Sequence, residues 1–297
     1  MRLLSNFCQL RKICILFLGL SFLISFESEA LSQSQKNVFL VLQKKLIEEE
    51  DFDKRFINKI YNRPKVFFDK NSVSGYFRHN EAKLNYGQFT TTRSIKKAKS
   101  YLSKYSNLLK KAQTRYGVDK EIITAIFLVE TYLGKILGNS YVFNTLSTMA
   151  VLSEKKTRDF LWDEIPKSKR ISRKRFKKKA ADKSRWAYKE LKKFLQYSQK
   201  EGIDPTVIKG SYAGAFGICQ FIPSSVVRFG QDGNKDGRIN LFDHSDAIAS
   251  TAAYLKHFGW KPMTLKKKTK AHKVVLHYNY SNYYARTVLK VADLLKK

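Results

Sequence analysis

The stretch Asp119-Lys-Glu-Ile-Ile-Thr-Ala-Ile-Phe-Leu-Val-Glu130-Thr-Tyr-Leu-Gly134 decides how the rest of the chain is interpreted. Its apolar residues recur at helical spacing and predict a helix packed against a core. These residues are Ile122, Ile126, Val129 and Leu133. Asp119 is suited to the N-cap of this helix, and Gly134 to its stop. We therefore expect a helix over 119–134 that turns these apolar residues toward a core.

Glu130 is an isolated acid in this stretch, since no other Asp or Glu lies between Glu121 and Glu154. Ile126 and Phe127 lie one helical turn before it. A carboxyl group held against such side chains is poorly solvated, which raises its pKa. A carboxylic acid that keeps its proton near neutral pH can act as a general acid. The ordinary alternative is a solvent-facing glutamate on an amphipathic helix.

Helical patterning dominates the remainder of the sequence. The 297 residues, of which 43% are hydrophobic, suffice for one large domain or two ordinary ones. Further helical patterns cover 36–61, 94–116, 186–197, 245–258 and 283–295. The segment 64–92 contains Pro64, Gly75 and Gly87 and is expected to be extended and looping. The predicted class is mainly α, with little or no sheet.

The first thirty residues differ from the rest. Arg2, Arg11 and Lys12 precede the apolar run 13–26, and Ser28-Glu29-Ala30 resembles a small-x-small cleavage site. This pattern predicts a signal peptide over 1–30 and export from the cytoplasm. A retained membrane anchor is the alternative, but the run is shorter than the ~20 residues that a spanning helix needs. Cleavage would leave Cys219 alone, so that no internal disulfide forms, and Cys219 is expected to be a small buried apolar residue.

The chain is strongly basic, with 57 Lys and Arg against 25 Asp and Glu and a net charge of +32. Such a balance favours a polyanionic partner. Export argues against nucleic acid and in favour of envelope glycans and lipid headgroups. The densest basic run is 167–185. We expect either a solvated, mobile insertion or a charged helix face there, and a specific patch that anchors the protein to the anionic envelope surface is the alternative.

The segment 232–243, Asp-Gly-Asn-Lys-Asp-Gly-Arg-Ile-Asn-Leu-Phe-Asp, fits the spacing of a twelve-residue calcium loop. Gly237 stands where that loop turns sharply, and the last position holds Asp where Glu is usual. The expected ligands are Asp232, Asn234, Asp236, the backbone carbonyl of Arg238, Asn240 and Asp243. A polar turn without metal is the alternative. A single loop without a second one to pair with predicts one structural calcium ion, and no organic cofactor is expected.

A glycine-rich segment, Lys209-Gly-Ser-Tyr-Ala-Gly-Ala-Phe-Gly-Ile-Cys-Gln-Phe-Ile-Pro-Ser-Ser225, follows the basic run. Small residues at 210, 213, 214 and 217 let the backbone approach a neighbour closely. Ser211 and Gln220 are polar groups able to orient a ligand, whereas tight helix packing is the alternative reason for the glycines. Pro223 with the two serines after it predicts the start of a helix.

Four motifs occur in one order along the chain. They are Val129-Glu-Thr-Tyr-Leu-Gly134, Gly210-Ser-Tyr-Ala-Gly-Ala-Phe-Gly-x-x-Gln-Phe-x-Pro-Ser-Ser225, Asp236-Gly-x-Ile-Asn-Leu-Phe-Asp243 and Tyr278-Asn279. The set resembles the membrane-bound lytic transglycosylase B family, whose lysozyme-like domain cleaves peptidoglycan. The resemblance implies a helical domain of the lysozyme-like or goose-type-lysozyme-like kind over 101–297, with a single EF-hand-like loop. It also implies a smaller N-terminal segment over 31–100 and a basic insertion at about 154–185 that departs from the family pattern.

The resemblance also implies roles for individual residues. Glu130 corresponds to the family's catalytic acid and base. The residues that correspond to its glycan contacts are Ser211, Gln220, Tyr254, Tyr278 and Asn279.

A function follows from these assignments as an expectation. Most glycosidases use two carboxylates, and this sequence offers one outstanding buried acid. A single acid suffices if the 2-acetamido group of N-acetylmuramic acid assists and the C6 hydroxyl of the same sugar closes a 1,6-anhydro ring. We therefore expect a monomeric, exported lytic transglycosylase of the periplasm or envelope that acts on peptidoglycan glycan strands. The alternatives are a hydrolytic muramidase on the same scaffold and a non-catalytic envelope glycan-binding protein.

Overall fold

The computed structural model describes residues 38–80 and 84–296, so the predicted signal peptide lies outside the described residues. The described residues form two compact units, the first ending at Phe68 and the second beginning at Asp69. In the smaller unit, α2 (Leu40–Glu48) packs against α3 (Lys54–Tyr61). The apolar residues that these helices bury are Leu42, Leu46, Ile57 and Ile60. The helical pattern expected over 36–61 is thus present, with a break between the two helices.

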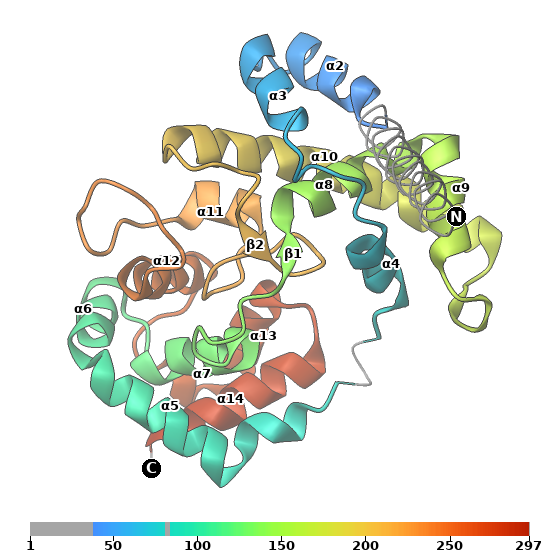
Figure 1. The fold of residues 1–297 in the computed structure, drawn as a ribbon. Helices are drawn as coiled ribbons and strands as arrows, with labels where there is room; N and C mark the ends of the chain where they lie inside the picture. Colours follow the sequence, from blue (N-terminus) through green and yellow to red (C-terminus); the bar gives the residue numbers. More distant parts are fainter. Residues whose placement is uncertain (1–37, 81–83, 297) are drawn as a thin grey trace, which may run out of the picture. The chain divides into compact units, whose positions relative to one another are not determined.

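The larger unit is built almost entirely from helices (Figure 1). Its α-helices are α4 (Lys70–Arg78), α5 (Thr92–Lys104), α6 (Ser106–Tyr116), α7 (Lys120–Thr131), α8 (Val142–Ala150), α9 (Lys155–Glu164), α10 (Arg173–Lys200), α11 (Pro223–Phe229), α12 (His244–His257), α13 (Lys268–Tyr278) and α14 (Asn282–Lys296). Short 3-10 turns are η2 (Tyr86–Thr90), η3 (Val151–Ser153), η4 (Lys167–Lys169) and η5 (Thr264–Lys266). One small antiparallel sheet pairs β1 (Ser140–Tyr141) with β2 (Lys209–Gly210).

The unit boundary differs from the one expected after residue 100. In the structure α4 packs against α8 and α9, and α5 packs against α7, so 69–100 belongs to the larger unit. The expectation of a looping stretch over 64–92 is wrong for α4. Its start is fixed by Asp69, whose carboxylate accepts a hydrogen bond of 3.0 Å from the backbone N–H of Ser72.

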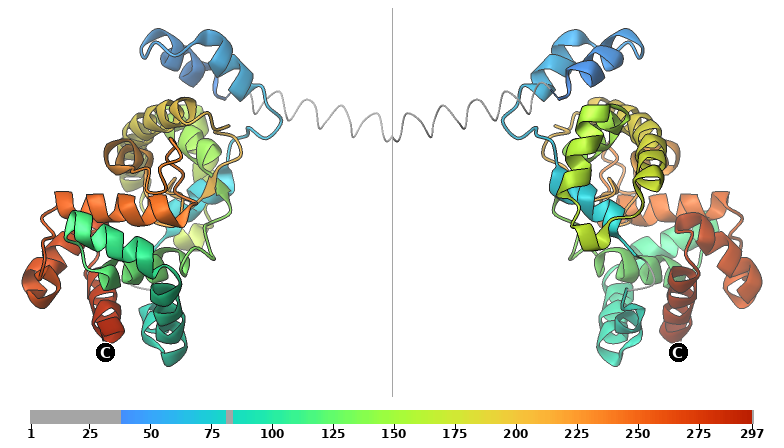
Figure 2. Two further views of the ribbon diagram at one scale, coloured as in Figure 1. Left: turned by 90° about the vertical axis from the view of Figure 1, so that its left-hand side faces the viewer. Right: turned by 90° about the vertical axis from the view of Figure 1, so that its right-hand side faces the viewer.

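The long helix α10 organises one end of the larger unit, with α8 alongside it and α13 and α14 at the other end (Figures 1 and 2). Apolar residues at helical spacing line its buried face, among them Phe176, Ala180, Ala187, Leu191 and Phe194. The basic stretch 154–185 forms α9, η4 and the first half of α10. Most of its lysines therefore lie on the exposed faces of folded helices. Of the two structures expected for this stretch, the structure has the charged helix face and not the mobile insertion.

The helix α7 lies in the other group and contacts α14, α5, α6 and α12. Its apolar residues from Ile122 to Leu128 are fully buried, which explains why it is apolar all round. Val129, expected in the core, is partly exposed. Asp119 takes the N-cap position, but its carboxylate accepts a hydrogen bond of 3.0 Å from the indole N–H of Trp260 instead of capping the helix. Across the described ranges no helix is long and apolar enough to cross a bilayer.

Candidate active site

Glu130 lies in the last turn of α7 and is partly exposed. The hydroxyl of Tyr284, in the first turn of α14, donates a hydrogen bond of 2.6 Å to Glu130 Oε1. Tyr284 is only 2% exposed, because α14 packs along α7. The carboxyl group is thus held from within while one side remains accessible. Tyr284 was not identified from the sequence, although it closely follows the Tyr278-Asn279 pair.

The Tyr284 phenol is a hydrogen-bond donor over the whole physiological pH range. Burial raises its pKa well above the ordinary value, and the neighbouring Glu130 carboxylate raises it further. A phenol that does not ionise keeps its proton and can donate to Glu130 whenever that group is a carboxylate.

A wall of tyrosines adjoins the Glu130–Tyr284 pair. The ring of Tyr278 stacks on that of Tyr284, with centroids 6.4 Å apart and planes 9° apart. The Tyr278 hydroxyl donates to the carbonyl of Cys219 at 2.6 Å. Tyr254 packs edge-on against Tyr278 at 5.1 Å, and its own hydroxyl donates to the carbonyl of His277 at 2.5 Å. Tyr254 is 7% exposed, burial raises its pKa to about 12, and its ring also packs against Phe258 at 4.7 Å.

The turn after Glu130 connects α7 to the glycine-rich segment. The hydroxyl of Thr131 donates to the carbonyl of Ile218 at 2.9 Å and accepts from the N–H of Gly134 at 3.0 Å. Tyr132 and Leu133 adopt left-handed backbone conformations, with φ of 51° and 66°. Such conformations are costly for these residue types and persist where their surroundings fix them. The Glu-Thr-x-x-Gly motif is therefore a device that holds the end of α7 against the glycine-rich segment.

The glycine-rich segment approaches its neighbours as closely as its composition predicts. A Cβ atom on Gly210 would lie 2.1 Å from the carbonyl oxygen of Ala215, and one on Gly217 would lie 2.4 Å from Leu241 Cβ. Within this tight turn the Oγ atom of Ser211 accepts hydrogen bonds from the N–H groups of Ala213 and Ala215, at 3.3 and 3.1 Å. These bonds use Ser211 as an acceptor and leave its own O–H to donate.

Gln220 is fixed at the mouth of this segment. Its backbone has a φ of 48°, and its side-chain N–H groups donate to the carbonyls of Gly217 at 2.9 Å and Leu137 at 3.2 Å. Both amide hydrogens are thus used, so that Oε1 is the atom it can offer to a ligand as an acceptor. Asn279 follows α13 as its C-cap and is partly exposed beside Tyr278.

Four carboxylates of the described residues are buried, and each accepts hydrogen bonds from backbone N–H groups. Glu190 accepts hydrogen bonds of 2.8 Å from both the N–H and the hydroxyl of Ser224, at the start of α11. Glu201 accepts from the N–H of Ile239 at 2.8 Å, and Asp69 caps α4. Asp246 is the fourth. These acids are committed to holding the backbone.

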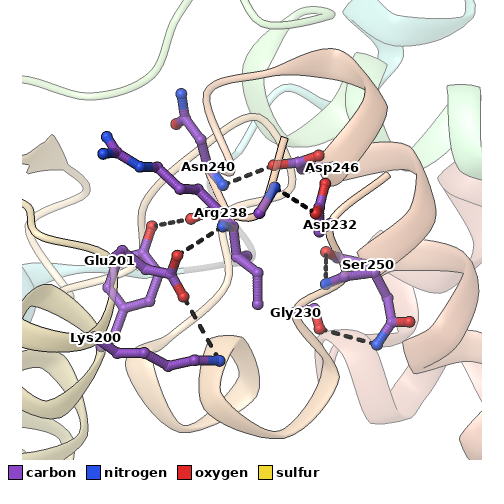
Figure 3. A network of polar contacts seen from close by, with 12 residues as sticks. Lys200, Glu201, Gly230, Asp232, Arg238, Asn240, Asp246 and Ser250 are labelled. Carbon is purple, nitrogen blue, oxygen red and sulfur yellow. Dashed lines mark hydrogen bonds and ion pairs between the residues drawn. The ribbon is translucent and has the colours of Figure 1, made fainter. Parts of the chain in front are cut away.

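The segment 232–243 forms a compact polar loop (Figure 3). Asp232 accepts hydrogen bonds from the N–H groups of Lys235 at 2.6 Å and Gly237 at 2.9 Å, and Asp236 accepts from that of Arg238 at 2.9 Å. Glu201 anchors the loop to the end of α10 through Ile239. Side-chain and carbonyl oxygens gather here, and oxygen is the donor that calcium prefers.

Asp243, the last of the expected ligands, and Asp246, which was not expected, lie on different sides of this loop. The carboxylate of Asp243 is the N-cap of α12 and accepts from the N–H of Ser245 at 2.7 Å. Asp246, fully buried in the first turn of α12, accepts from the N–H groups of Gly233 at 2.8 Å and Asn240 at 2.7 Å. Asp246 therefore faces the loop from the side that Asp243 was expected to close. In the part of the chain that the structure describes, no three His, Cys, Asp or Glu side chains converge as a metal site.

Cys219 is fully buried, as the sequence predicts, and burial raises its pKa to about 12. It is therefore a protonated packing residue with no nucleophilic character.

A separate groove of about 1260 Å³ lies between α6 and the start of α12, where Tyr105 stacks on His244. Glu130 does not line that groove.

Comparison with known proteins supplies the family. The family model described as the transglycosylase SLT domain matches residues 35–266 of this chain. Membrane-bound lytic murein transglycosylase B of Escherichia coli (strain K12) is 32% identical over 182 residues, which are 61% of this chain and 43% of that protein. The match thus spans less than half of that relative.

Solved structures share the fold. The Escherichia coli lytic transglycosylase Slt35 in complex with bulgecin A is 23% identical, with a TM-score of 0.66 over 86% of this chain and 91% of that one. Slt35 has also been solved in complex with calcium, at 22% identity and a TM-score of 0.67, over the same shares of the two chains. SltB3 from Pseudomonas aeruginosa in complex with NAG-anhNAM-pentapeptide is 19% identical, with a TM-score of 0.69 over 88% of this chain and 80% of that one. The predicted mainly helical, lysozyme-like fold is confirmed, and the chain belongs to the transglycosylase SLT domain family.

Proposed function

We propose that this protein is a lytic transglycosylase, which cleaves the β-1,4 bond between N-acetylmuramic acid and N-acetylglucosamine in peptidoglycan and leaves 1,6-anhydro ends. The observation that carries the proposal is the Glu130–Tyr284 pair, a partly exposed carboxyl group fixed by a buried phenol within a chain of the SLT domain family. The SltB3 complex with an anhydro-muropeptide supports this class of product by analogy.

A single-carboxylate mechanism agrees with the remaining acids. Acid–base or acid–nucleophile glycosidases place a second carboxyl group about 5–9 Å from the first. The four buried carboxylates of the described residues accept hydrogen bonds from backbone or hydroxyl groups and have structural roles. The nucleophile is therefore supplied by the substrate.

Glu130 acts first as an acid and then as a base. It gives its proton to the glycosidic oxygen, and the C1–O bond of N-acetylmuramic acid breaks with assistance from the 2-acetamido carbonyl. The carboxylate then removes the proton of the C6 hydroxyl, whose oxygen attacks C1. The anhydro ring closes, Glu130 regains its proton and no water is consumed. Tyr284 keeps the carboxyl group oriented through both steps, because its phenol remains a donor.

The glycine-rich segment supplies the contacts that orient the sugar. Gln220, with its amide N–H groups engaged, offers Oε1 to the acetamido N–H. Ser211 offers its hydroxyl proton to a substrate oxygen, and Asn279 offers its amide. Tyr278, backed by Tyr254, provides an aromatic wall.

A calcium ion is proposed as a structural component of the loop 232–243. The calcium complex of Slt35 supports this by analogy. The oxygen groups of the loop fit a hard cation, with Asp246 in place of Asp243 as the closing carboxylate. The proposed ligands are Asp232, Asn234, Asp236, the carbonyl of Arg238, Asn240 and Asp246. The ion would stiffen the loop and takes no part in bond cleavage.

The sequence and the relatives support a proposal for the compartment in which the protein acts. We propose an exported monomer that acts in the periplasm or envelope on glycan strands. Its basic helix face over 154–185 would hold it near anionic envelope components. Membrane-bound lytic murein transglycosylase B is the relative whose name supports a membrane-associated setting.

Digestion of purified peptidoglycan with mass analysis of the products tests the reaction. Anhydro products lack the water that hydrolysis adds, so their mass separates this proposal from a muramidase. The Glu130→Gln variant should keep its fold, measured by circular dichroism, and release no soluble muropeptide. Release by that variant would refute the assignment, and binding to sacculi without any product from the wild type would favour a glycan-binding protein.

A further inference from the structure

Four tyrosines lie between the end of α13 and the first turn of α14, where Tyr284 is buried, Tyr278 is half-buried and the other two are exposed. Tyr278 and Tyr284 belong to the aromatic wall beside Glu130. Tyr280 is 94% exposed and Tyr283 is 58% exposed. In the described part of the chain no aromatic ring packs against either exposed tyrosine. Their rings are thus presented to solvent by the same short segment that contacts the proposed catalytic acid.

Neither exposed ring is needed to start α14. Ser281 fills the N-cap role, because its Oγ accepts from the N–H of Tyr284 at 3.2 Å and its carbonyl accepts from that of Ala285 at 2.9 Å. An apolar residue just before an N-cap ordinarily packs onto the fourth helical residue, here Ala285. Tyr280 holds that position, yet its ring remains in solvent. Folding therefore leaves its apolar surface unused.

The chain itself keeps these rings close to the reaction centre. Adjacent Cα atoms are about 3.8 Å apart, so the backbone of Tyr283 lies beside that of Tyr284, whose hydroxyl touches Glu130. Tyr280 directly follows Asn279. Arg286 is exposed one helical turn after Tyr283, which adds a positive charge to the same surface. Exposed aromatic rings suit the apolar faces of sugars, and the cation suits the carboxylates of the peptides that peptidoglycan sugars carry.

We propose that Tyr280 and Tyr283 form a platform that binds sugar units of the glycan strand beyond the pair cleaved at Glu130. This inference rests on the proposed function and deepens it. It attributes a preference of the enzyme for long glycan strands to two residues that lie outside the sequence motifs. The platform adds binding energy only when the strand is long enough to reach it. It therefore sets which substrates are cleaved efficiently, and leaves the chemistry at Glu130 as it is.

The Tyr280→Ser/Tyr283→Ser double variant tests the platform. The measured quantity is the ratio of kcat/KM on purified long glycan strands to kcat/KM on a tetrasaccharide peptidoglycan fragment. Loss of two ring contacts should lower this ratio about tenfold relative to the wild type. Phe160→Ser, which removes an exposed ring on α9, is the control and should leave the ratio unchanged. An unchanged ratio in the double variant, whether both rates fall together or neither falls, would overturn the inference.

A binding measurement keeps the platform testable apart from catalysis. Sedimentation with purified sacculi compares the Glu130→Gln variant with the same variant carrying both serine substitutions. The serine substitutions should weaken binding about tenfold. Equal binding would overturn the platform even if cleavage is confirmed. Weaker binding would support it even if the product analysis excludes the anhydro reaction.

Discussion

The hydrogen bond from Tyr284 to Glu130 is the contact on which the proposed chemistry depends at the scale of single residues. Tyr284→Phe removes the donor and retains the buried ring. Hydrogen bonds to charged groups contribute about 1.5–3 kcal/mol, so kcat should fall roughly 10- to 100-fold. The pH profile of kcat should also shift, because the lost hydroxyl contacts the titrating group.

Tyr197→Phe is the matched control for this prediction. Its hydroxyl is also buried and donates to the carbonyl of Ile239 at 2.8 Å, in the polar loop. The control should lower the free energy of unfolding by about 1 kcal/mol and leave kcat unaltered. Equal kcat values for Tyr284→Phe and the wild type would show that Tyr284 is only a packing residue.

Glu130 can be recognised from the sequence, whereas its hydrogen-bond partner Tyr284 cannot, for a physical reason. Glu130 is conspicuous because it interrupts an apolar helix, and local pattern suffices to find it. Tyr284 is 154 residues away and acquires its role only when α14 packs along α7. The position of Asp246 beside the calcium-type loop was not expected, for the same reason. Spacing alone predicts the twelve-residue loop, whereas the N-cap of α12 decides which carboxylate faces it.

At the scale of elements, the polar loop offers a test that separates these two acids. Chelator should lower the melting temperature of the wild type if the loop binds calcium. Asp246→Ala should abolish that sensitivity and also destabilise the loop, since its carboxylate binds backbone N–H groups. Asp243→Ala should cost about 1 kcal/mol as a lost N-cap and keep the sensitivity. A calcium effect that survives Asp246→Ala but not Asp243→Ala would restore the original ligand set.

The helix pair α4 and α10 provides a pH-dependent prediction. Lys183 lies over the rings of Trp186 and Tyr76, at 3.3 and 4.3 Å from their centroids, and burial lowers its pKa to about 8. An unfolded lysine titrates near 10.4, so the unfolded chain binds the extra proton between these values. Stability should therefore rise with pH above about 8, by on the order of 1 kcal/mol between pH 7.5 and 9.5.

Urea unfolding of the wild type and of Lys183→Met at both pH values measures this effect. The methionine variant lacks the titrating group and should lose most of the rise in unfolding free energy. Lys178→Met, a change on the exposed face of the same helix, should retain it. An identical rise in Lys183→Met would show that another group is responsible.

At the scale of the whole molecule, the fold class was readable from composition and periodicity, because helices with apolar stripes dominate the chain. The boundary between the two units could not be predicted from the sequence, because α4 and α5 join the larger unit through contacts with helices distant along the chain. The short helices α8 and α13 were also not predicted from the sequence. The first is buried on every side, so that it lacks an amphipathic period, and the second carries lysines that obscure its pattern.

The net charge of +32 predicts salt-dependent binding to anionic surfaces. Exchange of Lys174, Lys177 and Lys178 for glutamine should weaken binding to vesicles that contain anionic lipid at least tenfold, since each lysine near such a surface contributes about 1 kcal/mol. Exchange of Lys266, Lys267 and Lys270 removes the same charge elsewhere. Equal losses for the two triple variants would assign binding to the overall charge and not to the α10 face.

The site joins a helix near the middle of the chain to the helix that begins at Asn282. A nascent chain in which α14 has not yet been synthesised has Glu130 but lacks the phenol that orients it and the helix that covers α7. The proposed activity consequently requires residues 282–296 to have been made and folded against α7. If the protein cleaves peptidoglycan as proposed, this order of assembly delays cleavage of the wall until after α14 has been synthesised.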